Sequence, residues 1–441
     1  MGKRVVVLGL DGVPFTFLKK LFSEGKMPYL KSLTEKGSFS QMDSVFPPVS
    51  SCAWSSFMTG KNPGGHNIFG FVDKNKNNSL YIPTSENMTS KTLWEILSDN
   101  GKKVVVMNVP VTYPPRDVNG ILIGCFLCPN IEKITNDKVI LNYLKAVGYK
   151  IDADASIAKN ESKEKFMEEI YDAFEKRKKV MFTLMEKKQW DFFMCHIMET
   201  DRLNHFFWGE MEDKHPLFYK KYMEFMQKID DLIKEVKNKL DQNTELILLS
   251  DHGFCKVKCE YEINHWLKEK GYLVLYEDRN KEMLHKIDFT KTKALSLIPG
   301  RFYITNNKNN KEKHKEIRNQ LTQDLKELKD DDGTKIIQII ENKENIFSGI
   351  SYENAPDLTV IPTNGYDLKG QIDSNQRKIT GGLITGMHTF EDSFFYMDTK
   401  TQIYRKGFNI GDLMPTILDI MEIPKPSDLS CKSIKNPPKS I

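Results

Sequence analysis

Short apolar runs of strand length alternate with amphipathic stretches of helix length along most of this 441-residue chain. Apolar runs at residues 5–10, 103–108, 192–196 and 245–249 each predict a buried strand. Helical periodicity covers residues 15–36, 91–99, 161–188 and 218–240. Alternation of this kind is typical of an α/β fold, with a mostly parallel sheet and helices on both faces. In such a fold, ligands bind on the loops that follow the carboxyl ends of the strands.

The segment from residue 261 to residue 350 does not continue the alternation of strands and helices. It is rich in loop-forming residues and contains a charged helical run at 311–329. We interpret it as an inserted cap region that packs on the sheet. A strand is predicted again at 357–361 and a helix at 412–421. The chain is therefore expected to comprise a core, residues 1–260 and 351–441, and an inserted cap, residues 261–350.

Composition and charge exclude several classes of protein. Hydrophobic residues make up 39% of the chain and charged residues 28%, which is typical of a globular protein with a solvated surface. Lys and Arg total 64 against 60 Asp and Glu, without the basic face that binding to a nucleic-acid duplex needs. Lysine-rich stretches at 74–78 and 307–315 alternate with Asn and Glu, and they are interpreted as solvated loops.

Nothing in the sequence suggests a membrane segment. No stretch approaches the ~20 apolar residues that span a bilayer, and the run at 5–10 is too short for a signal-peptide core. A cytoplasmic location is therefore expected. The seven cysteines are scattered, and Cys125 and Cys128 are expected to be buried as small hydrophobic residues. No feature indicates an oligomeric state.

Carboxylate and imidazole side chains follow the predicted strands. Five of a set of six fall at strand ends on one rim of the sheet: Asp11, Asp201, His205, Asp251, His252 and His388, the last lying far downstream. Three carboxylates on one rim repel each other, and bound cations remove that repulsion. Three imidazoles beside them suit a borderline ion such as zinc better than magnesium.

The stretch from residue 46 to residue 70 supplies a candidate nucleophile, Ser50. A hydroxyl beside divalent ions loses its proton near neutral pH, because a metal lowers the pKa of a bound oxygen. Ser50 also suits the start of the helix predicted from Ala53 onward. The two roles are compatible, since a helix N-terminus favours an anion.

Together these residues resemble a known family. The matching segments are residues 8–12, 47–54 with 59–64, 199–208, 250–254, 386–388 and 412–418. They resemble the type I phosphodiesterase/nucleotide pyrophosphatase family of the alkaline phosphatase superfamily, over nearly the whole chain. The resemblance implies an alkaline-phosphatase-like catalytic core that hydrolyses phosphodiester or nucleotide pyrophosphate bonds of a small-molecule phosphoester substrate.

The resemblance also implies residue roles and cofactors. Two divalent ions are expected, with zinc favoured and manganese an alternative. One ion is implied to bind Asp201, His205 and His388. The other is implied to bind Asp11, Asp251, His252 and the oxygen of Ser50. Ser50 occupies the position of the family's nucleophile, which forms a covalent phosphoryl-enzyme intermediate.

Two positions depart from the nucleotide pyrophosphatases. Their Asn, about twenty-one positions after the nucleophile, corresponds here to Phe71. Their aromatic residue after the nucleophile, which stacks on the nucleotide base, corresponds to Ser51. Base stacking contributes about 1–3 kcal/mol in nucleic-acid binders, so a preference for nucleotides lacks this support.

Three alternatives remain open. A phosphomonoesterase or a phosphonate hydrolase would use the same two-metal site. A monoester specialist needs an extra cation, but Arg202, next to Asp201, is expected to point away from the metals. An inert binding protein is less consistent with seven competent side chains. The other six histidines, including His196 at the end of a buried strand, are interpreted as structural or surface residues.

Overall fold

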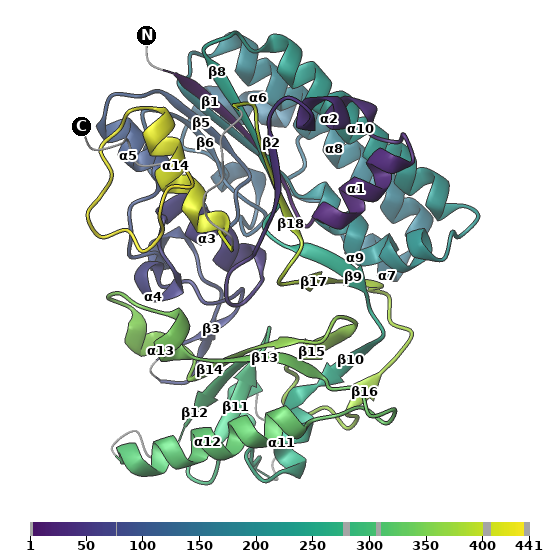
Figure 1. Ribbon diagram of the computed structural model, residues 1–441, viewed down its shortest axis with the longest axis vertical. Coiled ribbons are helices and arrows are strands. Elements are labelled where there is room, and N and C mark those ends of the chain that lie inside the picture. Colours follow the sequence, from purple (N-terminus) through teal and green to yellow (C-terminus); the bar gives the residue numbers. More distant parts are fainter. Residues whose placement is uncertain (1–2, 76, 277–282, 306–309, 400–406, 436–441) are drawn as a thin grey trace.

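The computed structural model describes residues 3–75, 77–276, 283–305, 310–399 and 407–435 (Figure 1). Its largest sheet has seven strands in the order β2-β18-β8-β1-β7-β5-β6. Five strands run parallel, which confirms the expected α/β fold: β1 (Arg4–Leu10), β5 (Val104–Met107), β6 (Gly120–Ile123), β7 (Phe192–Ile197) and β8 (Thr244–Leu249). At one edge, β18 (Ser393–Met397) pairs antiparallel with both β8 and β2 (Ser38–Met42).

Successive side chains of each strand point to opposite faces of the sheet, so both faces are apolar. Helices cover both faces and form two cores. Val6 and Leu8 of β1 face the larger core, whereas Val5 and Val7 face the other. The helices on the larger core are α1 (Phe15–Ser23), α2 (Pro28–Thr34), α6 (Lys138–Ala146), α7 (Ser156–Asn160), α8 (Lys163–Lys187), α9 (Glu199–Glu212) and α10 (Phe218–Lys239). The other core is covered by α3 (Ser50–Thr59), α5 (Leu93–Asp99) and α14 (Leu413–Ile420).

Most predicted elements are confirmed, with one correction. The helix predicted at 15–36 is two helices, α1 and α2. Gly25, between them, has a φ of +68°, a left-handed conformation that ends a helix, and Pro28 begins the next one.

Helix α3 lies on the sheet through close contact between Trp54 and Gly9. The Trp54 ring occupies the space that a Cβ atom at Gly9 would need. Gly9 lies in β1, so its missing side chain lets α3 approach the central strand directly. The short helix α4 (Pro63–His66) follows α3.

A second group of strands lies apart from the central sheet, in the lower part of Figure 1. Four antiparallel strands form one sheet in the order β11 (Ala294–Leu297), β12 (Arg301–Ile304), β14 (Leu358–Pro362) and β13 (Ile337–Asn342). A three-stranded sheet has the order β15 (Tyr366–Lys369), β10 (Cys259–Glu262) and β16 (Lys378–Ile379). Helices α11 (Ile263–Glu269), α12 (Lys311–Glu327) and α13 (Lys343–Ile346) accompany them. The cap boundary at residue 350 stays a prediction, although β14 and β15, beyond it, pair with strands of this group.

Two short ribbons connect the two groups of strands. β9 (Gly253–Lys256) pairs with β17 (Gly386–Thr389), and β3 (Asp73–Lys74) pairs with β4 (Leu80–Tyr81). The buried Arg301 of β12 forms an ion pair with Asp73 of β3 and donates to the Val72 carbonyl at 2.6 Å. Cys125 and Cys128 are buried, as expected. Within the described ranges, no helix is long and apolar enough to cross a membrane.

Candidate active site

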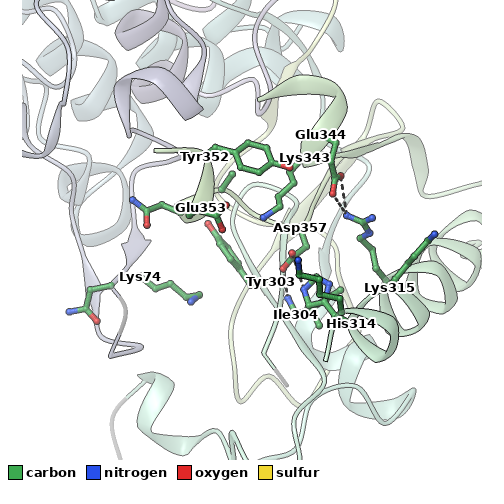
Figure 2. Close-up of a pocket in the computed structure, with 15 residues that line it drawn as sticks. Lys74, Tyr303, Ile304, His314, Lys315, Lys343, Glu344, Tyr352, Glu353 and Asp357 are labelled. Atoms are coloured by element: carbon green, nitrogen blue, oxygen red, sulfur yellow. Dashed lines mark hydrogen bonds and ion pairs between the residues drawn. The ribbon is translucent and has the colours of Figure 1, made fainter. Parts of the chain in front are cut away.

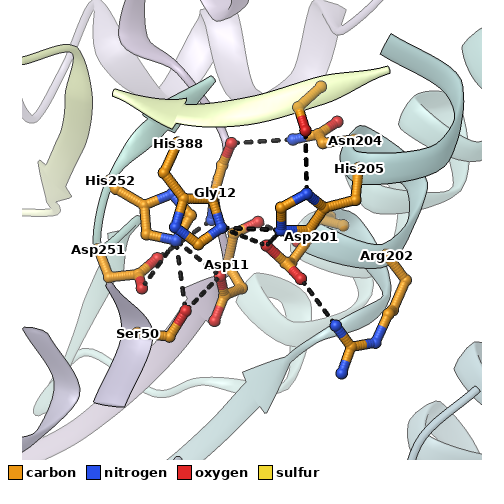
Figure 3. A network of polar contacts seen from close by, with 12 residues as sticks. Asp11, Gly12, Ser50, Asp201, Arg202, Asn204, His205, Asp251, His252 and His388 are labelled. Atoms are coloured by element: carbon orange, nitrogen blue, oxygen red, sulfur yellow. Dashed lines mark hydrogen bonds and ion pairs between the residues drawn. The ribbon is translucent and has the colours of Figure 1, made fainter. Parts of the chain in front are cut away.

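The carboxyl ends of β1, β7 and β8 bring the sequence-predicted residues to one place (Figure 3). Because β1 lies between β7 and β8, the residues that follow these parallel strands converge. Asp11 follows β1, and Asp251 and His252 follow β8. Asp201 and His205 lie one turn apart on α9, which starts just after β7. His388 comes from β17, and Ser50 is the first residue of α3.

Three of these side chains form one compact group, Asp201, His205 and His388. The Nε2 atoms of His205 and His388 are 2.9 Å apart, and each lies 3.3 Å from Asp201 Oδ1. Donors bonded to one zinc ion at about 2.0–2.1 Å in a tetrahedron lie about 3.3 Å from one another. The spacing of the three donor atoms therefore fits a single ion.

A second group contains Asp11, Asp251 and His252, with the Ser50 hydroxyl beside them. His252 Nε2 lies 3.3 Å from Ser50 Oγ, 3.5 Å from Asp11 Oδ1 and 3.3 Å from Asp251 Oδ2. Ser50 Oγ lies 3.4 Å from Asp11 Oδ1. These four distances are close to the separation expected between donor atoms around one tetrahedral ion.

The protonation of the three imidazoles also fits a cation. In each ring Nδ1 faces a backbone carbonyl: Gly386 for His205 at 3.0 Å, Gly253 for His252 at 3.1 Å and Pro48 for His388 at 3.2 Å. A carbonyl only accepts, so each Nδ1 carries a proton, and Nε2 of a neutral ring presents a lone pair. The Nε2 atoms of His205 and His388 face each other at 2.9 Å, an arrangement that a shared cation stabilises.

The pKa values of two buried carboxylates also indicate that a cation would stabilise their ionised forms. Burial, together with the nearby Asp201, raises the pKa of Asp11 to about 7. Burial and then the charge of Asp11 raise the pKa of Asp251 well above its usual value. Asp251 Oδ2 is buried and accepts no hydrogen bond from any described residue. Burial lowers the pKa of His205 to about 4, which keeps its imidazole neutral and able to bind a metal.

Two side chains hold the other oxygen of Asp11. His196 Nε2 lies 2.6 Å from Asp11 Oδ2, and Trp54 Nε1 donates to the same oxygen at 3.1 Å. Asp11 Oδ1 is therefore turned toward Ser50 and His252. The orienting contact of His196 was missed from the sequence, although a histidine inside an apolar strand is a signal, because a buried polar group needs a partner.

A buried ion pair fixes the start of α9, which carries Asp201 and His205. Arg177 of α8 and Glu199 are both almost completely buried, with Arg177 Nη2 2.7 Å from Glu199 Oε1. Arg177 also donates to the Tyr149 hydroxyl at 2.8 Å. This pair too was missed from the sequence. Its signal is a charged residue on the apolar stripe of α8, between the buried Phe174 and Met181.

Arg202 lies beside Asp201. Its Nη1 donates to Asp201 Oδ2 at 3.2 Å, whereas His205 and His388 face the other oxygen, Oδ1. Its Nε also donates to Asp152 at 3.1 Å. The carboxylates of Asp152 and Asp201 therefore compensate the charge of Arg202. In turn, Arg202 fixes the orientation of Asp201.

The two positions that depart from the nucleotide pyrophosphatases are both packed against other parts of the fold. Ser51 is buried within α3. The partly buried Phe71 packs edge-on against Phe126, with 5.6 Å between ring centroids.

Comparisons with known proteins show the family and the fold. Residues 5–390 match the model of the type I phosphodiesterase / nucleotide pyrophosphatase family. Phosphonoacetate hydrolase from Sinorhizobium meliloti 1021, solved with phosphonoformate, is 14% identical, with a TM-score of 0.64 and 96% of each chain covered. Murine ectonucleotide pyrophosphatase/phosphodiesterase 5 is 15% identical, with a TM-score of 0.57 and 97% of this chain and 98% of that chain covered. These two structures are similar in fold. No curated protein matches the chain by sequence.

Removing Arg177 is expected to destabilise the protein, because it leaves the Glu199 carboxylate buried without a partner. Arg177→Met is predicted to lower the free energy of unfolding by about 3–5 kcal/mol. Lys178→Met is the matched control, since Lys178 is the next residue and makes a solvent-exposed pair with Glu235. That change is predicted to lose at most about 1 kcal/mol. Urea unfolding followed by circular dichroism measures both, and equal losses in the two variants would contradict a structural role for the buried pair.

Proposed function

Because this chain belongs to the type I phosphodiesterase / nucleotide pyrophosphatase family, we propose that it is a two-metal hydrolase of phosphodiester or nucleotide pyrophosphate bonds. Family membership supports a hydrolase of phosphoester or phosphonate bonds. One observation carries the finer proposal: two groups of candidate metal ligands lie at the same strand ends, and the hydroxyl of Ser50 lies beside one of them, with Ser50 Oγ 3.3 Å from His252 Nε2.

The two groups would each hold one divalent ion. Asp201, His205 and His388 would hold one, and Asp11, Asp251, His252 and the Ser50 oxygen would hold the other. When bound, the two ions would neutralise charge on the phosphoryl group and lower the pKa of a hydroxyl beside them. Three imidazole ligands and tetrahedral donor spacing favour zinc, and manganese is the alternative.

Ser50 is the proposed nucleophile. Its hydroxyl donates to Asp11 Oδ1 at 3.4 Å, and its place at the start of the ten-residue α3 favours an anion. The Ser50 oxygen would attack phosphorus as the leaving group departs. Water would then hydrolyse the phospho-serine, so that covalent catalysis divides one hard step into two easier ones.

The surroundings of Arg202 favour a diester over a monoester substrate. A monoester carries an additional negative charge, which needs a cation with free donors. Arg202, the cation beside Asp201, already pairs with Asp152 and Asp201. A phosphonate or phosphomonoester hydrolase is the second candidate, because the same ions would neutralise either group, and the fold is similar to that of a phosphonoacetate hydrolase.

Ser50→Ala tests the nucleophile. We expect the rate of hydrolysis of bis-p-nitrophenyl phosphate to fall at least about 10³-fold, because the group that attacks phosphorus is removed. Folding and most bound metal are expected to persist. Ser51→Ala, which removes a neighbouring buried hydroxyl from the same helix, serves as the control and should keep most of the activity. Substantial turnover by Ser50→Ala would refute the covalent mechanism.

The substrate class is tested by comparing three substrates with the zinc-reconstituted and the manganese-reconstituted protein. We expect bis-p-nitrophenyl phosphate to be hydrolysed faster than p-nitrophenyl phosphate, since Arg202, the cation beside Asp201, is already paired with two carboxylates. Phosphonoacetate is expected to be a poor substrate. Faster cleavage of the monoester or of phosphonoacetate would favour the second candidate instead.

A further inference from the structure

A large cavity lies in the second group of strands, apart from the candidate active site. It has a volume of about 840 Å³, within the range of roughly 300–1,000 Å³ typical of small-molecule sites. Its walls come from β3, β12, α12, α13 and the 3₁₀ helix η4 (Tyr352–Asn354) (Figure 2). None of the seven candidate active-site residues lines it.

Basic side chains outnumber acidic ones on the cavity wall. Helix α12 contributes four residues with the spacing of one helical face: Lys311, His314, Lys315 and Arg318. Lys74 of β3 and Lys343 of α13 line the cavity from other elements (Figure 2). The lysine-rich stretches at 74–78 and 307–315 were predicted to be solvated loops. Residues 76 and 306–309 lie outside the described residues, but Lys311 and Lys315 belong to a helix that faces the same cavity as Lys74.

Only part of this positive charge is compensated. Three carboxylates line the cavity, Glu344, Glu353 and Asp357. Arg318 Nη1 lies 2.7 Å from Glu344, and His314 Nε2 lies 3.2 Å from Asp357. By contrast, Lys311, Lys315 and Lys343 form no ion pair with any residue in the described part of the chain, which leaves an excess of cations.

Two further features favour an anion in this cavity. Lys343 Nζ stands over the Tyr352 ring, 4.7 Å from its centroid, a contact that leaves the ammonium hydrogens available to an acceptor. The N-terminus of the 17-residue α12 lies at the cavity through Lys311, and a helix N-terminus carries partial positive charge.

We propose that this cavity binds a small molecule that carries a phosphate group. The excess of ammonium groups and the start of α12 suit the phosphate. The volume of the cavity leaves room for a small organic group attached to it. This site would be distinct from the proposed active site and would not require metal. Inorganic phosphate and a nucleoside monophosphate share the recognised group, and the two ligands are tested separately.

The test counts the sites on zinc-reconstituted protein by isothermal titration calorimetry with AMP, inorganic phosphate and adenosine. AMP, phosphate or both should occupy a site additional to the metal centre, whereas adenosine should not. In Lys311→Gln/Lys315→Gln this additional site should weaken at least about tenfold, because two charge-assisted contacts are lost. Lys343→Gln, on a separate element, should weaken it as well.

The control is Lys313→Gln/Lys326→Gln, which removes the same charge from exposed positions of α12 outside the cavity wall. It should bind like the wild type. Hydrolysis of bis-p-nitrophenyl phosphate, measured on every variant, separates this site from the proposed active site. A wild type without the additional site, or a cavity variant that binds as tightly as the control, would overturn the proposal.

Discussion

The burial of three carboxylates beside one another is the constraint on which the rest of this structure depends. Asp11, Asp201 and Asp251 are all almost inaccessible to solvent, and each lies just beyond a parallel strand. Burial and repulsion from neighbouring carboxylates raise the pKa of Asp11 to about 7 and that of Asp251 well above its usual value, whereas His205, His388 and Arg202 lower the pKa of Asp201. The imidazoles of His205 and His388 beside Asp201, and that of His252 beside Asp11 and Asp251, would complete two cation sites. The proposed role of Ser50 as the nucleophile rests on the same geometry.

The surrounding fold holds these groups in place. Gly9 lets Trp54 reach Asp11, and so couples the helix that begins at Ser50 to the central strand. The buried Arg177–Glu199 pair fixes the start of α9. Buried ion pairs contribute little net stability but restrict geometry, because a misplaced partner is left unpaired. We infer that the buried pair serves to orient the donor atoms on α9 more than to stabilise the fold, as is common at functional sites.

Much of the site could be predicted from the sequence because its signals are local. Each of Asp11, Asp251 and His252 directly follows an apolar run, and parallel strands bring such positions together. The contacts of His196 and Arg177 were missed, since their partners lie far away in the sequence. The break between α1 and α2 at Gly25 was hidden within one continuous periodic pattern. The basic cavity could not be predicted either, because Lys74, Lys311 and Lys343 meet only through the packing of separate elements.

The proposed function depends on two adjacent cation sites, one of which includes the oxygen of Ser50. Anomalous diffraction at the zinc edge, from crystals of the zinc-reconstituted protein, tests it most directly. Two strong peaks per chain are expected. One should lie among Asp201, His205 and His388, and the other among Asp11, Asp251, His252 and Ser50. A single peak, or peaks bound by other side chains, would contradict the account.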